Sequence, residues 1–278
     1  MATTAKTPAE IAAAAKANAG TYLAAIPPEI NTGKRLLERY SGISPDKVDE
    51  HIIQIRDKAW TIFPYGCIGT FNFLNLDHED QDAQFQRVVA RLVAPGSTET
   101  FLDVGCCMGG TIRYLADRGV ASQRLYGTDL QGGFLELGYE LFGDGDGDSA
   151  RRSWTTFVAG DMTMMGESGD GVFAPLEGTI DVIYASNFFH LFEREGQVRA
   201  AKRMVGFLRA GNPDVLIFGR NMGRKIQGWE RYILDERGWR GMWEEVGEAT
   251  GTAWETTLDV DESEEGWIKV KFVVRRGQ

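Results

Sequence analysis

The chain has 278 residues, 43% hydrophobic and 25% charged, a globular composition that allows one large domain or one domain with an appended helical cap. The net charge of −10 argues against binding to a nucleic-acid backbone or to an anionic membrane surface. No run of about 18 apolar residues occurs, so no membrane span is expected. Three cysteines give no disulfide framework, so we expect a cytoplasmic protein without a signal peptide.

Residues 1–79 are expected to form a helical cap. Thr7-Pro8-Ala9-Glu10 has the pattern of a capping box with proline at the first helical position, which predicts an alanine-rich helix to about Ala19. A second helix is expected after Pro27-Pro28, and Ser44-Pro45 starts a third. Their apolar residues recur at helical spacing: Ile30, Leu36, Leu37 and Tyr40 in the second helix, and Val48, Ile52, Ile55 and Ala59 in the third.

An aromatic stretch from Trp60 to Leu76 follows and has no clear period. Its aromatic side chains are too many for an exposed loop, so they form either core or the wall of an apolar pocket. We expect a substrate-binding role for four aromatic residues, one of them further along the chain: Phe63, Tyr65, Phe71 and Phe189.

One amphipathic helix is predicted from Asp80 to Ala94, ended by Pro95-Gly96-Ser97. The apolar residues expected on its buried face are Phe85, Val88, Val89, Leu92 and Val93. The next apolar run begins at Thr100 and is short enough for a buried strand.

A glycine loop follows that strand. Asp103 closes the apolar run, glycines at 105, 109 and 110 interrupt the pattern, and a helix is expected to about Asp117. Strand, small-residue turn and helix form the layout in which a backbone approaches a nucleotide-like ligand closely.

Strands and helices alternate after this loop. The expected strands are Arg124–Asp129, Trp154–Ala159, Ile180–Ser186 and Asp214–Phe218, and the expected helices are about Phe134–Leu141, Gln197–Leu208 and Glu230–Ala249. Two alternating strands, Trp254–Val260 and Trp267–Val274, predict an antiparallel hairpin at the edge of a parallel sheet. Residues 80–278 are therefore expected to form a doubly wound, Rossmann-like α/β domain with seven strands.

Two metal interpretations fail on residue type. Counted from Asp144, the sixth and twelfth positions of the acidic Gly143–Ser149 run are Ser149 and Thr155, where a calcium loop needs glycine and glutamate. Cys106 and Cys107 have no further cysteine or nearby histidine to complete a site. We expect a surface loop and no metal. The tryptophans Trp229, Trp239 and Trp243 are expected in the core.

Asp129 lies 24 residues after Gly105, at the end of a predicted strand, where a carboxylate accepts both ribose hydroxyls of an adenosine-type ligand. That position fits a dinucleotide or S-adenosylmethionine. The spacing Gly105-x-Cys107-x-Gly109 is tighter than the G-x-G-x-x-G pattern of pyrophosphate binders, and a terminal hairpin is not typical of dinucleotide domains. Asp103 suits the ammonium group of a methionine tail.

The chain resembles class I S-adenosylmethionine-dependent methyltransferases from about Gln84 to Val274. The resemblance is carried by four motifs: Asp103-x-Gly105-x-Cys107-x-Gly109, Gly127-Thr-Asp129, Gly160-Asp161 and Asp181-Val-Ile-Tyr-Ala-Ser-Asn187. It implies a ribose contact at Asp129 beside Leu130, an adenine contact at Asp161 or Met162, and contacts to the methionine portion at Ser186 and Asn187. Cys107 replaces the usual middle glycine of the loop.

A narrower resemblance is to fungal methyltransferases of meroterpenoid and polyketide pathways. Its motifs are Gly105-Cys-Cys-Met-Gly109, Leu137-Gly-Tyr-Glu-Leu-Phe142, Tyr184-Ala-Ser-Asn-Phe-Phe-His-Leu-Phe192 and Phe218-Gly-Arg220. It implies an O-methyltransferase that acts on a carboxyl or hydroxyl group of a small, apolar secondary-metabolite intermediate. A homodimer is expected, although the sequence does not fix the oligomeric state.

Two side chains are catalytic candidates. A carboxylate acceptor needs orienting donors, which Arg220 or His190 could supply, whereas a phenol benefits from a base, for which His190 is well placed. The alternative for His190 is a hydrogen-bonded residue at a helix start, and for Arg220 a surface charge after a strand. Two other functions stay open: a methyltransferase fold that binds S-adenosylmethionine but catalyses a cyclisation or rearrangement, and an NAD(P)-dependent oxidoreductase, whose Tyr/Lys pair and dinucleotide fingerprint are not found.

Overall fold

The computed structural model describes residues 7–145, 155–164, 166, 171–224, 235–262 and 267–277. The chain divides into two compact units. The first contains Met1–Thr98 and Cys106–Ala159, and the second contains Glu99–Gly105 and Gly160–Gln278. The helical cap therefore belongs to the same compact unit as most of the glycine loop. The predicted domain boundary at residues 79 and 80 stays a prediction.

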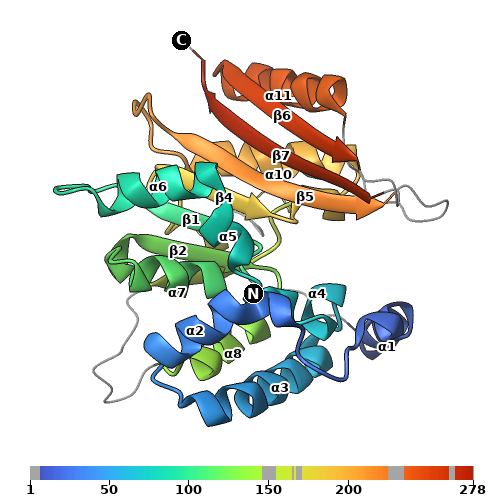
Figure 1. The fold of residues 1–278 in the computed structure, drawn as a ribbon. Helices are drawn as coiled ribbons and strands as arrows, with labels where there is room; N and C mark the ends of the chain where they lie inside the picture. Colours follow the sequence, from blue (N-terminus) through green and yellow to red (C-terminus); the bar gives the residue numbers. More distant parts are fainter. Residues whose placement is uncertain are drawn as a thin grey trace. The chain divides into compact units, whose positions relative to one another are not determined.

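The first unit is mainly helical (Figure 1). Its helices are α1 (Pro8–Asn18), α2 (Asn31–Arg39), α3 (Pro45–Ile62), α4 (Gly66–Gly69), α5 (Asp77–Gln81), α6 (Ala83–Val93), α7 (Gly110–Asp117) and α8 (Gly132–Phe142). Single 3₁₀ turns are η1 (Ala19–Thr21), η2 (Pro28–Ile30), η3 (Asn72–Leu74) and η4 (Ser122–Arg124). Its strands are β2 (Leu125–Asp129) and β3 (Thr156–Ala159), which pair in parallel.

The three helices predicted at the start of the chain are confirmed. Thr7 and Glu10 form the capping box of α1, since the Thr7 side chain accepts from the Glu10 backbone and the Glu10 side chain accepts from the Thr7 backbone. Ser44 is the N-cap residue of α3. Most of the apolar residues predicted for these two helices are buried within them: Leu36, Leu37, Val48, Ile52, Ile55 and Ala59. Ile30 is buried but lies in η2, and Tyr40 follows α2 and is half-buried.

The single helix predicted from Asp80 to Ala94 is wrong at its start. The chain forms two helices, α5 and α6, separated at Asp82. Asp82 has extended backbone angles, and its side chain accepts a hydrogen bond from the Phe85 N–H at 2.9 Å, as an N-cap residue does. The apolar face of α6 is buried as predicted except at Val93, which is 42% exposed in the last turn.

The second unit carries the larger part of the sheet. Its strands are β1 (Phe101–Val104), β4 (Val182–Ser186), β5 (Leu216–Arg224), β6 (Trp254–Glu262) and β7 (Trp267–Arg276). Its helices are α10 (Arg194–Phe207) and α11 (Glu236–Thr250), with 3₁₀ turns η5 (Gly171–Phe173) and η6 (Phe189–Leu191). Trp154, Trp229 and parts of the predicted 143–149 loop and 230–249 helix lie outside the described residues.

The strand order β3-β2-β1-β4-β5-β7-β6 confirms the predicted seven-stranded fold class. The β1–β4 and β4–β5 pairs are parallel, whereas β7 pairs antiparallel with both β5 and β6. The largest boundary difference is in β5, which continues to Arg224 rather than ending near Phe218. The added residues pair with β7 from Trp267 to Phe272, so Arg220 lies within a strand rather than after one.

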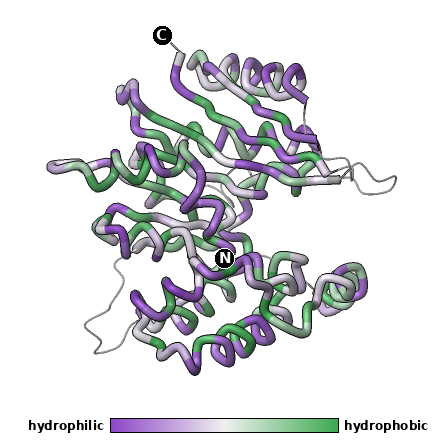
Figure 2. Tube along the Cα trace, viewed as in Figure 1, coloured by the Kyte–Doolittle hydropathy of each residue, from purple (hydrophilic) through white to green (hydrophobic). Residues whose placement is uncertain are grey.

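The terminal hairpin is matched by charge as well as by register. Glu255 faces Arg275, Asp259 faces Lys271 and Asp261 faces Lys269 across the β6–β7 ladder. Opposite charges at directly facing positions each contribute about 0.2–1 kcal/mol. Along β7 these basic residues alternate with buried apolar ones (Figure 2). One face of the hairpin is therefore charged and the other packs, as an edge hairpin requires.

The core of the second unit is aromatic. Trp239 and Trp243 are 3% and 1% exposed, as predicted for core residues. Trp239 packs against Phe189 and Phe272 with ring centroids 5.4 and 4.8 Å apart. This cluster joins α11, η6 and β7.

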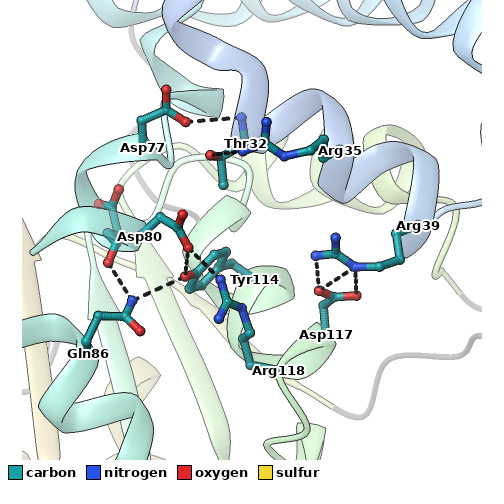
Figure 3. A network of polar contacts seen from close by, with 10 residues as sticks. Thr32, Arg35, Arg39, Asp77, Asp80, Gln86, Tyr114, Asp117 and Arg118 are labelled. Atoms are coloured by element: carbon teal, nitrogen blue, oxygen red, sulfur yellow. Dashed lines mark hydrogen bonds and ion pairs between the residues drawn. The ribbon is translucent and has the colours of Figure 1, made fainter.

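The cap helix α2 is joined to α5 and α7 by polar contacts within the first unit (Figure 3). The Thr32 N–H donates to Asp77 Oδ1 at 3.1 Å, and the Arg39 Nε donates to both oxygens of Asp117 at 2.9 Å. The next cap helix, α3, packs on α8, where His51 Nε2 lies 2.9 Å from the Leu141 carbonyl. The cap thus packs on the two helices that follow the glycine loop and β2. None of the described helices is long and apolar enough to cross a membrane.

A buried carboxylate anchors the start of β4. Asp181 is 3% exposed and accepts hydrogen bonds from the Thr100 N–H at 2.9 Å, Arg209 Nε at 2.8 Å and Asn212 Nδ2 at 2.8 Å. Burial alone would raise the pKa of Asp181, but the hydrogen bonds from Arg209, Thr100 and Asn212 outweigh it and hold the pKa below its usual value.

We predict that Asp181→Asn lowers the free energy of unfolding by about 2 kcal/mol at pH 7, because it removes charge-assisted hydrogen bonds. The folded-state pKa is lowered, so this stabilisation is present above the unfolded pKa of about 4 and is lost as the pH falls through the folded value. Urea titrations at pH 7 and at lower pH should show the difference shrinking below about pH 4. The exposed Asp214→Asn is the control, with an effect under about 0.5 kcal/mol. A difference that is constant with pH would contradict the account.

Candidate functional site

The glycine loop of the first unit is held by backbone hydrogen bonds. The Cys106 N–H donates to the Thr128 carbonyl at 3.0 Å, which ties the loop to β2. The Gly109 N–H donates to the Cys106 carbonyl at 2.8 Å and closes a tight turn, after which α7 begins. Gly109 has φ 70°, and a Cβ atom there would lie 2.4 Å from Nη1 of Arg113, so only glycine fits.

Cys107 adopts the left-handed conformation that glycine ordinarily supplies, with φ 53°. This explains how the loop keeps its shape although Cys107 replaces the usual middle glycine. The Cys107 N–H donates to Asp129 Oδ2 at 2.8 Å, so the strained residue presents its amide to the carboxylate at the end of β2. Strained residues of this kind gather at ligand sites.

Asp129 is half-buried, and both of its carboxylate oxygens accept backbone N–H groups. Besides the contact from Cys107, its Oδ1 accepts from the Gln131 N–H at 2.9 Å. Burial raises the pKa of Asp129, and the N–H donors of Gln131, Cys107 and Leu130 only partly offset it. Each carboxylate oxygen has a second lone pair, so two adjacent ligand hydroxyls could complete the hydrogen bonding and favour the charged form. These acceptor positions fit a ribose diol.

Tyr65 of the cap lies beside this carboxylate. Burial and then the charge of Asp129 raise the pKa of Tyr65 to about 12, while a hydrogen bond from the Gln131 side chain lowers it. Its ring packs against Phe63 and Phe134, with centroids 4.4 and 6.0 Å away. Tyr65 and Phe63 therefore lie near the end of β2. No sequence motif predicted a role for Gln131 or this placement of Tyr65.

The third aromatic candidate of the cap lies deeper. Phe71 is fully buried, and the Arg56 guanidinium lies 4.5 Å from its ring centroid. Phe71 also has φ 60°, in the left-handed region. Of the two alternatives for the aromatic stretch, core or pocket wall, these contacts describe core packing.

In the second unit, Asp103 and Gly105 lie at the end of β1. Asp103 is 4% exposed and lies opposite Tyr184 in the parallel ladder with β4. Gly105 has φ 73°, and a Cβ atom there would lie 3.0 Å from the Phe188 ring. The chain after β1 thus passes close to the segment that follows β4.

Asp161 and Met162 follow β3 in the chain. Asp161 Oδ1 accepts from both the backbone N–H and the hydroxyl of Thr163, at 2.8 and 2.7 Å, which closes a local turn. Met162 is 4% exposed, and its carbonyl accepts from Arg203 Nε at 3.3 Å. The turn that carries both candidates is therefore fixed from α10.

Ser186 and Arg220 lie opposite each other in the β4–β5 ladder, and Arg220 Nε donates to Ser186 Oγ at 3.1 Å. The next residue, Asn187, has φ 52° and donates its N–H to the Arg220 carbonyl at 2.7 Å. Asn187 Oδ1 is buried and has no hydrogen-bond partner among the described residues. A buried acceptor of this kind is suited to a ligand donor such as an ammonium group.

The other catalytic candidate, His190, is 4% exposed within η6. This turn packs against β5, the strand of Arg220. Its neighbour Phe189 belongs to the aromatic core described above. Residues 186–190 and Arg220 are thus brought together, with Phe189 facing the interior. Among the described residues, no three potential metal-ligating side chains gather at one point.

Two family patterns match the chain. Residues 22–74 match the meroterpenoid methyltransferase N-terminal domain, and residues 102–211 match a methyltransferase domain. The solved structure of the methyltransferase domain of bacterial CtHen1-C is similar in fold, with a TM-score of 0.51 and 14% identity, covering 73% of this chain and 100% of that domain.

Characterised fungal proteins are more similar in sequence. The O-methyltransferase phiE of a fungal species is 39% identical over 231 residues, covering 80% of this chain and 73% of phiE. The O-methyltransferase atr3 of Stereocaulon alpinum is 36% identical, and the match covers 79% of this chain and 62% of atr3. The asnovolin E/chermesin D methyltransferase nvfJ of Aspergillus novofumigatus is 34% identical, and the match covers 79% of this chain and 77% of nvfJ.

We predict that Cys107→Gly leaves the free energy of unfolding within about 1 kcal/mol of the parent, because glycine adopts φ 53° without strain. Cys107→Val should lower it by about 2 kcal/mol, since a β-branched residue is strongly disfavoured there. Thermal unfolding of both variants tests this. Cys67→Val, at an exposed cysteine of α4, is the matched control and should change stability by less than about 0.5 kcal/mol. Equal losses for the two valine variants would refute the role of the left-handed conformation.

Proposed function

The chain belongs to a family of fungal O-methyltransferases, and we propose that it uses S-adenosylmethionine to methylate a carboxyl or hydroxyl group of an apolar secondary-metabolite intermediate. The observation that carries the cofactor assignment is the Asp129 carboxylate, which takes backbone donors from both the glycine loop and its own turn. A meroterpenoid or polyketide acceptor is part of the proposal. So are a cytoplasmic location and a homodimer.

The residues proposed to bind the cofactor fall into groups, according to the part of the cofactor that each contacts. Asp129, beside Leu130, accepts the ribose hydroxyls, and Asp161 or Met162 contacts the adenine. Asp103, Ser186 and Asn187 serve the methionine portion, supported by the unpartnered buried oxygen of Asn187. Gly105, Cys107 and Gly109 give the loop backbone its close approach.

When bound, S-adenosylmethionine supplies a methyl group on a positively charged sulfur. The protein's own contribution is alignment of the acceptor, which can supply roughly 7–11 kcal/mol of the barrier reduction. Tyr65 and Phe63 are proposed to line the acceptor side. Phe71 and Phe189, also proposed as substrate-binding residues, are buried in the cores of the first and second units. Such apolar aromatic walls suit an apolar acceptor.

The role of His190 depends on the acceptor. A carboxyl group, with a pKa of about 4, is already ionised at neutral pH. It needs only orienting donors, which Arg220 and His190 supply. A phenol, with a pKa of about 10, needs a base, and His190 is the proposed base. The Ser186 hydroxyl holds Arg220 in place through the 3.1 Å hydrogen bond.

We predict that Asp129→Asn weakens binding of S-adenosylmethionine and S-adenosylhomocysteine by about a hundredfold, because hydrogen bonds to a charged acceptor are lost. Calorimetric titration of parent and variant with both ligands and with NADPH measures this. Glu136→Gln, an exposed carboxylate of α8, is the control and should bind as the parent does. A parent protein without affinity for either adenosyl ligand would sink the proposal.

We predict for a phenol acceptor that His190→Ala lowers kcat by about a hundredfold or more, as loss of a general base does. For a carboxyl acceptor the loss should stay below about tenfold, because only an orienting donor is removed. Methyl transfer from labelled S-adenosylmethionine to a panel of aryl-terpenoid acids and phenols measures both. Tight cofactor binding without transfer to any member would instead support the cyclisation or rearrangement alternative.

A further inference from the structure

Arg113 is an interior arginine of α7, one turn after the glycine loop. It is 1% exposed, and its backbone N–H donates to the Gly109 carbonyl at 3.2 Å. A fully buried guanidinium is expensive unless its donors are paired, so its partners indicate what it holds in place. Neither sequence motifs nor the proposed cofactor contacts assign it a role.

One partner is the loop backbone itself. Arg113 Nη1 donates to the Met108 carbonyl at 3.4 Å. The absence of a side chain at Gly109 makes room for this nitrogen, since a Cβ atom there would lie 2.4 Å from it. The same Met108 carbonyl is approached from α8, where a Cβ atom at Gly138 would lie 2.5 Å from it. The loop therefore rests between a guanidinium and a helix backbone, with little room to move.

The second partner is an equally buried carboxylate. Arg113 Nε and Nη2 donate to the two oxygens of Asp144, both at 2.9 Å, in a bidentate pair. Asp144 is 0% exposed and follows Gly143, which caps α8 with φ 63°. Its Oδ2 also accepts from the Tyr40 hydroxyl at 2.9 Å. Tyr40 ends α2, so this hydrogen bond reaches the cap.

Aromatic rings enclose the guanidinium on its remaining sides. Its carbon lies 4.7, 5.1 and 5.3 Å from the ring centroids of Phe157, Phe142 and Tyr139. Cation–π contacts of this kind strengthen when water is excluded. One side chain thus contacts the loop, β3, the end of α8 and, through Asp144, the cap.

We propose that Arg113, held by Asp144 and Tyr40, is a positioning residue that fixes the glycine loop in its cofactor-binding shape and couples cofactor affinity to the packing of the cap. This rests on the proposed function, since the affinity in question is that for S-adenosylmethionine. Arg113 touches neither the reacting atoms nor the cofactor. It acts through the Met108 carbonyl and so through the amide of Cys107, which binds Asp129.

Two variants test the proposal while leaving most of the packing intact. Tyr40→Phe removes only the hydroxyl that binds Asp144, and Arg113→Lys keeps a charge for Asp144 but loses the planar fork that also reaches Met108. Each should weaken S-adenosylhomocysteine binding by about fivefold or more in calorimetry, the size of a typical coupling between sites. Amide hydrogen exchange in a peptide spanning residues 104–112 should also be faster in the free variants.

The control is Arg39→Gln, which breaks the neighbouring contact from α2 to Asp117 on α7 without touching the loop. It should leave both the affinity and the exchange of residues 104–112 unchanged, which separates loop positioning from general loosening of the cap. Thermal melts establish that each variant is folded.

Folded Tyr40→Phe and Arg113→Lys proteins that bind within about twofold of the parent would overturn the proposal, because that is less than any typical coupling. Equal effects from Arg39→Gln would overturn it as well. A parent that binds no S-adenosylhomocysteine would instead remove the proposed function, and this inference with it.

Discussion

The hydrogen bond from the Cys107 amide to the Asp129 carboxylate is the contact on which the candidate site depends. It fixes the loop after β1 to the end of β2, and it orients the carboxylate through one of its two oxygens. The second oxygen is fixed by Gln131, so the carboxylate cannot turn without losing a charge-assisted bond. For this contact to form, Cys107 must adopt a left-handed backbone, which the surrounding turn enforces. A strained amide and a desolvated carboxylate thus stabilise each other, and a ligand diol would complete the arrangement.

The helical cap packs around the same glycine loop and Asp129. Residues 22–74 match a domain pattern of their own, yet the helices of this segment pack on α7 and α8 within one compact unit. Tyr65 lies beside Asp129, and Tyr40 binds Asp144. Arg113 joins Asp144 to the Met108 carbonyl, so the cap is connected to the glycine loop through side-chain contacts.

Local sequence patterns predicted the order and type of the strands, because apolar runs and turn residues report on burial at short range. They also placed Asp129 at the end of a strand, where β2 ends. The patterns failed where a distant partner decides the outcome. Strand β5 is longer than its apolar run because β7 supplies hydrogen bonds to its polar end. The break at Asp82 depends on a single side-chain cap within an otherwise continuous helical pattern. The roles of Gln131, Tyr40 and Arg113 depend on tertiary contacts that no spacing encodes.

The position of β7 in the sheet has a consequence for the order of folding. Strand β6 precedes β7 in the chain, yet among the described strands it pairs only with β7, which lies between it and β5. While the polypeptide emerges from the ribosome, β6 leaves the exit tunnel before β7 does. Its acidic residues, Glu255, Asp259 and Asp261, keep such a waiting strand hydrated and repel another copy of itself. Basic residues of β7 come to face them only when β7 pairs, so the acidic residues that match the charges of the hairpin also protect β6 against aggregation earlier in folding.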